Sequence, residues 1–423
     1  MTKDHRKAQG RKAQLEVVGK QRKLALGEVL LDVRAELREL MFHGGMAVVG
    51  ALFDEDLDQL CGKRYGRKDQ EAGLGARWGH QRGQVVLGGR KVSLSRPRAR
   101  RSGEELALPS YARLQLEDPL NDRMMEQMLI GVSTRNYRRS LEPVLGEFPE
   151  SVVDKSSVSR RFIVRTKEQL KAALKKPLGG IEWAALYIDG INFAEHVVVI
   201  ALGLDANGKK HLLGLREGST ENGTLCKEML SDLVERGMPV DRALLIVIDG
   251  GKGLRKAVRD VFAQYGVVQR CQVHKTRNVL DQLPEVKKPS VRVALREAYN
   301  SETYETALKR LTNLARVLAK EHPGAASSLR EGLEETLTVK RLGLTGALER
   351  SLRTTNPIEN LNSGIRRISG RVKRWRSGEM VLRWAAASAL DAEKRFHRLK
   401  GYKAIPLLLA ALRNHDHQLA AAA

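Results

Sequence analysis

Cysteine is scarce in this chain of 423 residues, which contains only Cys61, Cys226 and Cys271. The three lie far apart, no Cys-x-x-Cys pair occurs, and an odd number leaves one thiol without a disulfide partner. A closed zinc site built on cysteine pairs is therefore not expected. An apolar stretch of the roughly 18 uncharged residues that a membrane span needs is also missing. The first residues, MTKDHRKAQGRK, lack the apolar core of a signal peptide. We therefore expect a cytoplasmic protein with no membrane partner.

Acidic residues are in short supply relative to basic ones. The chain has 74 Lys and Arg against 50 Asp and Glu, a formal net charge of +24. Such an excess most often serves to neutralise phosphates, so a polyanion, and nucleic acid above all, is the expected partner. A ribosome-associated or merely soluble basic protein remains the alternative. The apolar fraction of 42% and the charged fraction of 29% are typical of a globular protein, and the length predicts two to four domains.

Residues 1 to about 60 show a helical pattern, with apolar side chains three and four residues apart. The pattern consists of Leu26, Leu30, Val33, Leu37 and Leu40. From Cys61 to about Pro97, Gly and Arg are interspersed with short β-prone runs such as QVVLGG and KVSLS, and RPRARRSG follows as a solvated linker or a DNA-contacting strand. We therefore predict a basic N-terminal region that is helical first and partly β afterwards.

Two short helices are predicted further along the chain. In LIGVSTRNYRRSL, Ser133 or Thr134 can cap a helix that follows a Gly turn. In VDKSSVSRRF, Ser156 or Ser157 can cap a second one. A helix-turn-helix presents such a pair to the major groove of DNA, and an ordinary small helical domain with a basic surface is the alternative. The DNA-binding interpretation assigns contacts to Arg135, Arg138, Arg160 and Arg161.

A mixed sheet is predicted from Trp183 onward. Three strands are expected in AALYID, HVVVIALGLD and KKHLLGLR, the last two joined by the turn sequence Asp-Ala-Asn-Gly. A helix over residues 221–236, a buried strand in ALLIVID, a helix over residues 253–264 and a fifth strand in VVQRCQV follow. The order β-β-β-α-β-α-β builds a mixed sheet with helices on its faces.

The rest of the chain shows helical patterns only. Residues 285 to about 345 contain no strand candidate and are predicted to be all-helical. After Asn356 we expect a long basic helical region, then a helix over Ala404–Leu412 and a frayed Ala-rich tail. Six cations within eleven residues, with no acid among them, favour a polyanion contact over a solvated face. These cations are Arg366, Arg367, Arg371, Lys373, Arg374 and Arg376.

Two aspartates end predicted strands of the sheet. Asp189 follows the first apolar run and precedes Gly190, and Asp249 follows the fourth and precedes Gly250. Residues just beyond strand ends project into the ligand crevice of an α/β sheet. Two carboxylates held there repel each other unless a cation lies between them, so the pair predicts a divalent-metal site. An Asp before Gly is also a routine turn, and one such position alone would carry little weight.

Glu359 lies in TTNPIENLNSGIRR, which reads as a helix start. Asn356 suits the N-cap, Pro357 the first helical position, and Glu359 the carboxylate of a capping box. The functional interpretation instead points Glu359 at the two aspartates, and the segment alone does not decide between the two. The sequence CQVH, with Cys271 and His274, is weak evidence for zinc because two further ligands are missing. VIDGGKGLRK lacks the spacing of a phosphate loop, which excludes an NTPase of that type.

Five ordered motifs together resemble a known family. They are YIDGINFAEHVVVIALG, GSTENGT, VIDGGKGL, CQVHKTRN and TTNPIENLNSGIRR, and they resemble those of the Mutator-like transposases of bacterial insertion sequences, the IS256 family. The resemblance extends over MLIGVSTRNYRRSLEPVLG and covers most of the chain. It is weakest before residue 60 and after about residue 400.

The resemblance implies an RNase H-like catalytic core that is interrupted by a helical insertion. It implies an Asp-Asp-Glu triad of Asp189, Asp249 and Glu359, which would hold two Mg²⁺ ions, with Mn²⁺ as a substitute. The family's Cys-x-x-His signature falls on Cys271 and His274, so that His274 is counted with the catalytic residues. The activity implied is metal-dependent cleavage of DNA strands followed by strand transfer.

The implied partners are double-stranded DNA, both the terminal inverted repeats of the element and its target, and further copies of the chain in a homodimer or higher oligomer. The implied location is the bacterial cytoplasm, in association with the nucleoid. Two other classes stay open: an RNase H-like nuclease or resolvase that cuts without joining, and a non-catalytic DNA-binding regulator.

The predicted fold is therefore α/β, with a mixed-sheet core, an all-helical insertion and a mainly helical N-terminal DNA-binding region. The predicted segments are residues 1–109 (basic N-terminal region), 110–180 (helix-turn-helix-like region), 181–284 (first part of the core), 285–345 (helical insertion), 346–400 (last part of the core with the third acid and a basic helix) and 401–423 (C-terminal helix and tail).

Overall fold

The computed structural model describes residues 36–37, 39–64, 74–118, 123–141, 151–152, 154–218 and 223–422. The chain divides into two compact units, residues 1–165 and 166–423. Leu26, Leu30 and Val33 of the predicted N-terminal helix, and the predicted helix start at Glu221, lie outside the described residues. In the part of the chain that is described, no helix is both long and apolar enough to cross a membrane.

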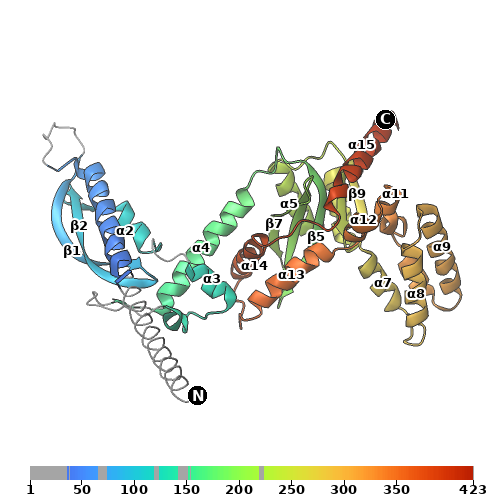
Figure 1. Cartoon of the computed structure of the whole chain (residues 1–423), viewed down its shortest axis with the longest axis horizontal. Coiled ribbons are helices and arrows are strands. Elements are labelled where there is room, and N and C mark those ends of the chain that lie inside the picture. The colour runs from blue at the N-terminus through green and yellow to red at the C-terminus, as the bar shows by residue number, and fades with distance from the viewer. Residues whose placement is uncertain are drawn as a thin grey trace, which may run out of the picture. The chain divides into compact units, whose positions relative to one another are not determined.

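The first unit is built on a long antiparallel β-hairpin (Figure 1). The hairpin and two short strands that pair with its second strand comprise β1 (Ala76–Leu87), β2 (Arg90–Arg101), β3 (Glu104–Leu106) and β4 (Ser151–Val152). The hairpin turns at Gly88 and Gly89, whose positive φ angles favour a residue without Cβ. Strand β2 continues to Arg101, so most of RPRARRSG is strand and not a linker.

Helices complete this unit. A helix through residues 39–61 packs its buried Val49, Phe53 and Leu57 against the hairpin. The other helices are α2 (Pro109–Leu114), α3 (Arg123–Ile130), the 3-10 helix η1 (Tyr137–Ser140) and α4 (Lys155–Lys175), which continues into the second unit. Apolar side chains from the helix of residues 39–61, from α2 and from the hairpin thus form a small core.

The described residues of this region do not form the predicted pair of short, Ser-capped helices. Ser133 is followed by a turn and by the four-residue η1, not by an α-helix. The second segment is the 21-residue α4, and its first turn is capped by Asp154, whose carboxylate accepts a hydrogen bond from the Ser157 amide at 3.0 Å. An aspartate at the N-cap starts the helix earlier than the predicted serines would.

The second unit contains a five-stranded mixed sheet in the order β7-β6-β5-β8-β9. Its strands are β5 (Trp183–Phe193), β6 (His196–Asp205), β7 (Lys210–Gly218), β8 (Leu244–Ile248) and β9 (Gly266–Arg270). Strands β5, β6 and β7 are antiparallel neighbours, whereas β8 runs parallel to both β5 and β9. The predicted mixed sheet and the predicted order of elements along the chain, β-β-β-α-β-α-β, are confirmed.

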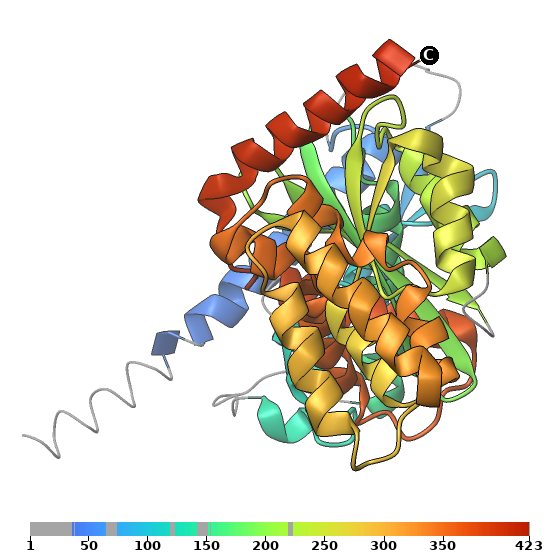
Figure 2. The same ribbon diagram turned by 90° about the vertical axis from the view of Figure 1, so that its right-hand side faces the viewer.

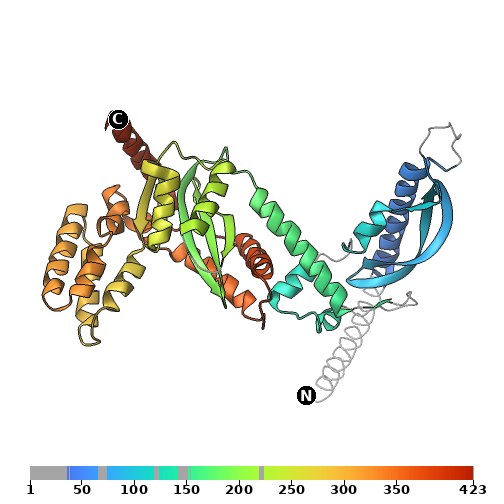
Figure 3. The ribbon, with the colours of Figure 1, turned by 180° about the vertical axis from the view of Figure 1, so that it is seen from behind.

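Helices cover both faces of the sheet, as Figures 1 and 3 show. Side chains alternate along β5, so that Leu186 and Ile188 face one layer while Ala185 and Tyr187 face the other. The first layer consists of α5 (Gly223–Glu235) and α6 (Lys252–Phe262). The second consists of α12 (Gly346–Leu352), α13 (Asn356–Ser369), α14 (Gly378–Glu393) and α15 (Ile405–Ala422).

A group of helices between β9 and α12 has a core of its own, which includes Leu295, Leu311 and Leu329 (Figure 2). It comprises α7 (Gln272–Leu280), α8 (Lys288–Tyr299), α9 (Tyr304–Glu321), α10 (Pro323–Arg330), the 3-10 helix η3 (Glu334–Leu337) and α11 (Thr338–Arg341). The expectation of helices without strands over residues 285–345 is confirmed. Two further 3-10 helices are η2 (Ala263–Tyr265) and η4 (Tyr402–Ala404).

The C-terminal part differs from the prediction in two respects. The chain beyond residue 356 is not one long helical region, because residues 372–377 between α13 and α14 have no regular structure. The last helix does not stop at Leu412: α15 continues to Ala422 and includes the Ala-rich tail. Alanine has the highest helix propensity of all residues, so the predicted fraying was wrong.

Candidate active site

Asp189 lies on β5, and Asp249 directly follows the neighbouring parallel strand β8. The register pairs Tyr187 of β5 with Val247 of β8. Each aspartate comes two residues after its paired residue, so alternation places both side chains on one face of the sheet. Both Tyr187 and Val247 belong to the core beneath α13. The two carboxylates therefore lie beside each other on the α13 face, at the end of the β5–β8 ladder.

Asp189 does not end its strand, in contrast to the prediction. Strand β5 continues to Phe193 because its other edge still pairs with β6, where Asp189 lies opposite Ile200. Pairing with the shorter β8 has already stopped at Tyr187. The prediction identified the end of the parallel ladder correctly, but a hairpin with β6 extends the strand itself.

Helix α13 brings two more polar side chains to this point. It packs on the sheet through Ile358, Leu361 and Ile365, all buried in the core. Glu359 lies in its first turn, and Asn362 lies one turn further on. The Asn362 side-chain amide donates a hydrogen bond of 2.8 Å to Asp189 Oδ2. This contact joins the helix directly to the first aspartate.

Glu359 does not form the predicted capping box. The N-cap of α13 is Thr355, one residue before the predicted Asn356, and its side chain caps no backbone amide. The Thr355 hydroxyl instead donates a hydrogen bond of 2.8 Å to Glu359 Oε1. In the predicted capping box the Asn356 amide would donate to the Glu359 carboxylate, but it donates to the Thr354 hydroxyl, at 3.4 Å. The explanation of Glu359 as a helix cap is therefore wrong.

Cys271 and His274 complete the site. Cys271 follows β9 and is the N-cap of α7, and its amide donates to the Ile248 carbonyl, next to Asp249. His274 Nε2 lies 3.7 Å from Glu359 Oε1, and His274 Nδ1 lies 3.3 Å from the Thr355 hydroxyl. One ligand atom each from Cys271, His274 and Glu359 falls within 4.8 Å of the other two. The sequence alone gave no third ligand for the Cys-x-x-His pair.

The charges at this site influence one another. Burial is the main cause that raises the pKa of Asp189 to about 6, and the negative charge of Asp249 adds to this effect. His274 and the Gly190 amide act in the opposite direction, whereas the charge of Glu359 raises the pKa of Asp189 further. The three carboxylates thus share one electrostatic environment. The first and the last of them are 170 positions apart in the sequence.

Cys271 and His274 shift each other's ionisation. Burial opposes ionisation of the Cys271 thiol, but hydrogen bonds with His274 and Thr355 outweigh it and lower the pKa of the thiol. The hydrogen bond with Cys271 is the main cause that raises the pKa of His274, and burial opposes this shift. The negative charges of Glu359 and Asp249 raise the pKa of His274 as well. A positively charged imidazole beside the acids is therefore favoured.

Asn362 is a residue that the sequence analysis did not select. Its side chain is 1% exposed, and its carbonyl oxygen has no hydrogen-bond partner among the described residues. A buried acceptor without a partner costs free energy, on the order of 1–3 kcal/mol, and needs an explanation. The spacing from Glu359 is three residues, which places both on one side of a helix, and this spacing was the only signal in the sequence.

The predicted DNA-binding residues of the first unit divide into two kinds. Arg135, Arg138 and Arg160 are exposed. Arg161 is buried, and its guanidinium lies 3.7 Å from the buried Asp118 carboxylate. Asp118 also accepts backbone hydrogen bonds from Gly88 and Gly89 at the hairpin turn. Arg161 therefore stabilises this unit internally, and its prediction as a DNA contact was wrong.

The cations after Glu359 are all exposed. Arg366 and Arg367 lie in the last turn of α13, and the others belong to the segment between α13 and α14. That segment is anchored by Trp375, whose ring contacts Phe193 at the end of β5 edge to face, with 5.3 Å between ring centroids. The cations are Arg366, Arg367, Arg371, Lys373, Arg374 and Arg376. An anchored tryptophan thus fixes part of a basic surface close to the strand that carries Asp189.

The chain matches a known family over most of its length. The family described as "Transposase, Mutator family" matches residues 29–398. The chain belongs to the Mutator family of transposases.

Individual relatives carry the same description. A transposase for insertion sequence element ISRM5 of Rhizobium meliloti (strain 1021) is 27% identical over 390 residues, which cover 91% of this chain and 94% of the relative. A transposase for IS406 of Burkholderia multivorans is 30% identical over 261 residues, 59% of this chain and 64% of that protein. A transposase for IS1081 of Mycobacterium tuberculosis is 25% identical over 354 residues, 80% and 81% of the two chains.

Proposed function

We propose that this chain is the transposase of an insertion sequence and that it cuts and joins DNA strands at Asp189, Asp249 and Glu359. Family membership supports the transposase role. The observation that carries the catalytic assignment is that Asp249, which follows β8, and Glu359 of α13 both act on the charge of Asp189 in β5. Burial and the charge of Asp249 raise the pKa of Asp189 to about 6, and the charge of Glu359 adds to this effect. Perturbed acids of this kind cluster at functional sites.

We also propose that the second unit is an RNase H-like core with a helical insertion. Three antiparallel strands followed by two parallel ones, with helices on both faces, support this assignment. The group from α8 to α10 has its own apolar core and stands between the second aspartate and Glu359 in the chain. A fold alone does not determine function, so the proposal depends on the acids and not on the sheet.

The acid site fits divalent cations. Carboxylate oxygens are the donors that Mg²⁺ and Mn²⁺ prefer, and the three acids supply them together. The orphaned Asn362 carbonyl oxygen adds a neutral oxygen donor close to Asp189. Asp189, Asp249 and Glu359 would together hold the two Mg²⁺ ions. Bound Mg²⁺ supplies Lewis-acid activation of water or a 3′-hydroxyl and stabilises the leaving oxygen.

The protein's own groups position the reactants and control the charge. Asn362 holds one oxygen of Asp189 in place through its 2.8 Å hydrogen bond. Thr355 does the same for Glu359, and its hydroxyl lies 3.3 Å from the His274 ring. His274, whose pKa is raised mainly by the hydrogen bond with Cys271, is suited to contact a scissile phosphate as a cation. Preorganised contacts of this kind need no rearrangement during the reaction.

Double-stranded DNA is the proposed substrate, at the terminal inverted repeats of the element and at its target. The exposed cations from Arg366 to Arg376 begin two turns after Glu359, which supports a role in backbone contact near the acids. Two element ends must be held together for strand transfer, so a homodimer or higher oligomer is expected on DNA.

Cleavage and strand-transfer assays on duplexes with the element's ends test the proposal. The wild-type chain should cut and join in Mg²⁺, whereas Asp189→Asn should bind the same DNA and do neither. Glu302→Gln, which neutralises an exposed acid in the helical group, is the matched control and should behave as wild type. Cutting without joining would indicate a nuclease or resolvase, and full cleavage by Asp189→Asn would refute the catalytic assignment.

A further inference from the structure

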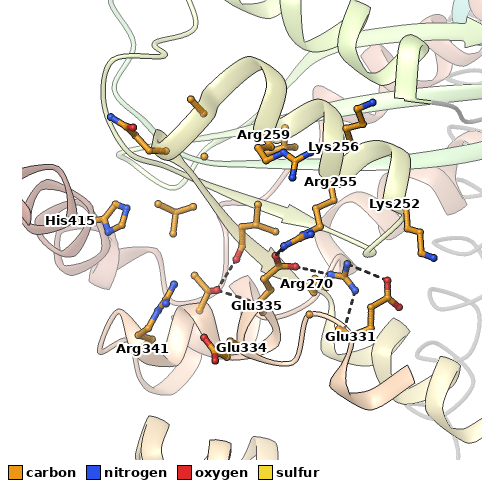
Figure 4. A pocket seen from close by; sticks show the side chains of 18 residues that line it. Lys252, Arg255, Lys256, Arg259, Arg270, Glu331, Glu334, Glu335, Arg341 and His415 are labelled. Carbon is orange, nitrogen blue, oxygen red and sulfur yellow. Dashed lines mark hydrogen bonds and ion pairs between the residues drawn. The ribbon is translucent and has the colours of Figure 1, made fainter. Parts of the chain in front are cut away.

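A second site lies along the outer edge of the sheet. A cavity of about 610 Å³ borders β9, the last strand of the sheet, and we call it the edge cavity. Helix α6 forms one wall, and the segment from Glu331 to Arg341 forms the other. His415 of α15 and Arg341 lie together across the cavity from Arg259 (Figure 4). The edge cavity is separate from the acid site, since none of its lining residues is one of the acids, Cys271 or His274.

Helix α6 presents a cationic side to this cavity. Leu254, Ala257 and Val258 are buried against the sheet. The residues that line the edge cavity from this helix include Lys252, Arg255, Lys256 and Arg259, all of them exposed. Their spacing of three and four residues places them on one side of the helix. The apolar side thus fixes the helix on the sheet while the cationic side faces open space.

The opposite wall is held firmly to β9. The Gln269 side chain donates to the Thr336 carbonyl at 2.9 Å and accepts from the Val339 amide at 2.9 Å. The Thr338 hydroxyl donates to the Val268 carbonyl at 2.7 Å. Gly332, with a φ of +62°, passes so close to Arg270 that a Cβ would lie 2.6 Å from the guanidinium. The cavity is therefore bounded by fixed structure on both sides.

Two of the acids in the cavity are already engaged. The buried Arg270 guanidinium lies 2.8 Å from Glu335 and 3.8 Å from Glu331. Arg255 donates a hydrogen bond of 2.6 Å to the same Glu335 carboxylate. Six Lys and Arg side chains line the cavity against three Glu, so these pairs leave an excess of positive charge.

The remaining cations have no ion-pair partner within the described part of the chain. They are Lys252, Lys256, Arg259 and Arg341. Like charges that surround one cavity repel each other, and an anion between them removes the repulsion. Arg259 and Arg341 come from different walls, so an anion in the cavity can be contacted from two sides (Figure 4).

We propose that the edge cavity binds the phosphates of a DNA backbone outside the acid site. Lys252 and Arg259 are seven residues apart, about 10 Å along a helix, which matches the rise of about three nucleotides, roughly 3.4 Å each, along the axis of a DNA duplex. No Trp, Tyr or Phe is among the residues that line the cavity, so no aromatic ring is available there for a base to stack on. Recognition through phosphates alone is independent of base sequence. The choice of DNA as the polyanion rests on the proposed function.

Binding measurements on the full-length chain test this proposal without using its activity. The test variant is Arg259→Glu/Arg341→Glu, which reverses one charge on each wall. The control is Arg316→Glu/Lys320→Glu, which makes the same change in net charge on an exposed side of α9 that lines neither site. The probe is a fluorescent duplex of about 20 base pairs with arbitrary sequence, titrated without divalent metal at several salt concentrations. Circular dichroism and melting temperature show whether each variant is folded.

We expect the test variant to bind DNA at least tenfold more weakly than the control variant at low salt. The slope of log K against log salt should fall by about 2, because each of the two arginines no longer neutralises a phosphate. Equal weakening in both variants would overturn the proposal, because net charge alone would then explain it. Loss of inorganic phosphate binding with unchanged DNA binding would also overturn it, since the cavity would then take a free anion only. Wild-type DNA binding without any cleavage would count against the proposed function and leave this site intact.

Discussion

The acid site and the edge cavity are close in the chain but opposite in character. Asp249 is three residues before Lys252, and Cys271 directly follows Arg270, so that the same strand ends supply both sites. In the acid site, half-buried carboxylates influence one another, and burial together with the charge of Asp249 raises the pKa of Asp189 to about 6. In the edge cavity, exposed cations surround open space with too few acids to neutralise them. In our proposal the acid site takes cations and the edge cavity takes anions, so the protein would contact a sugar-phosphate strand both through metal ions and through side chains.

The largest expected effect concerns chemistry alone. Glu359→Gln should lower the rate of single-turnover DNA cleavage on the order of 10³-fold or more, because one ligand of the metal ions is removed where charge develops. The DNA affinity of this variant should stay within about twofold of that of the wild type. Arg259→Glu/Arg341→Glu should do the reverse, with weak binding but a near-normal cleavage rate at saturating DNA. If Glu359→Gln cuts at the wild-type rate, the division of labour between the two sites is wrong.

The acid site should also destabilise the metal-free protein at neutral pH. A pKa of about 6 for Asp189 in the folded chain lies above the ordinary 3.8, so folding is favoured while the group is protonated. This contribution to the free energy of unfolding is on the order of 3 kcal/mol. It is fully present below about pH 4 and is lost as the pH rises through about 6.

In EDTA at pH 7, Asp189→Asn should therefore melt at a higher temperature than wild type, and the difference should shrink toward pH 4. Mg²⁺ should raise the melting temperature of wild type but not that of the variant. Thermal melts from pH 4 to 8 provide the measurement, with Glu302→Gln as the control for a change in net charge. A variant that melts below wild type at pH 7 would show that the Asp189 carboxylate is not under strain.

Asn362 links α13 to the acid site, and its removal should give an intermediate effect. Asn362→Ala deletes the 2.8 Å hydrogen bond to Asp189, and groups that orient metal ligands typically contribute 10- to 100-fold to metal affinity or activity. The Mg²⁺ concentration for half-maximal cleavage should rise, and high Mn²⁺ should restore part of the rate. A uniform loss of rate at every metal concentration would indicate a purely structural role.

The smallest expected effect separates paired from unpaired cations within the edge cavity. Arg255 already pairs with Glu335, so Arg255→Ala should change DNA affinity by less than twofold. Arg259→Ala should weaken it more and reduce the salt slope by about 1. Anisotropy titrations of the two variants under identical conditions make the comparison. Equal effects would show that pairing with Glu335 does not decide which cations bind DNA.

The two sites also differ in how far the sequence predicted them. Asp189 and Asp249 each follow an apolar run, which fixes the backbone before them, and the order of strands was readable from the same runs. Local pattern failed where a tertiary contact intervenes. The hairpin with β6 extends β5 past Asp189. The Glu359 carboxylate accepts a hydrogen bond from the Thr355 hydroxyl, and the Asn356 amide donates to Thr354, so the predicted capping box does not form.

Residues that act through a distant partner left little signal in the sequence. Asn362 meets Asp189 across 173 positions, and Arg161 has a buried acid beside it although its neighbour Arg160 is exposed. From the sequence alone, Arg160 and Arg161 look like equivalent members of a basic pair. The edge cavity was missed for a similar reason, because Arg259 and Arg341 converge only when η3 and α11 fold back on β9. The net charge of the chain shows an excess of cations but not where they gather.

Mn²⁺ binding followed by electron paramagnetic resonance, in the absence of DNA, tests the central claim most directly. The acid site predicts that wild type binds Mn²⁺, that Asp189→Asn and Asp249→Asn each weaken binding at least tenfold, and that Cys271→Ser keeps it. Binding that survives both aspartate variants but disappears in Cys271→Ser would contradict the account, because the cation would then belong to the group of Cys271, His274 and Glu359.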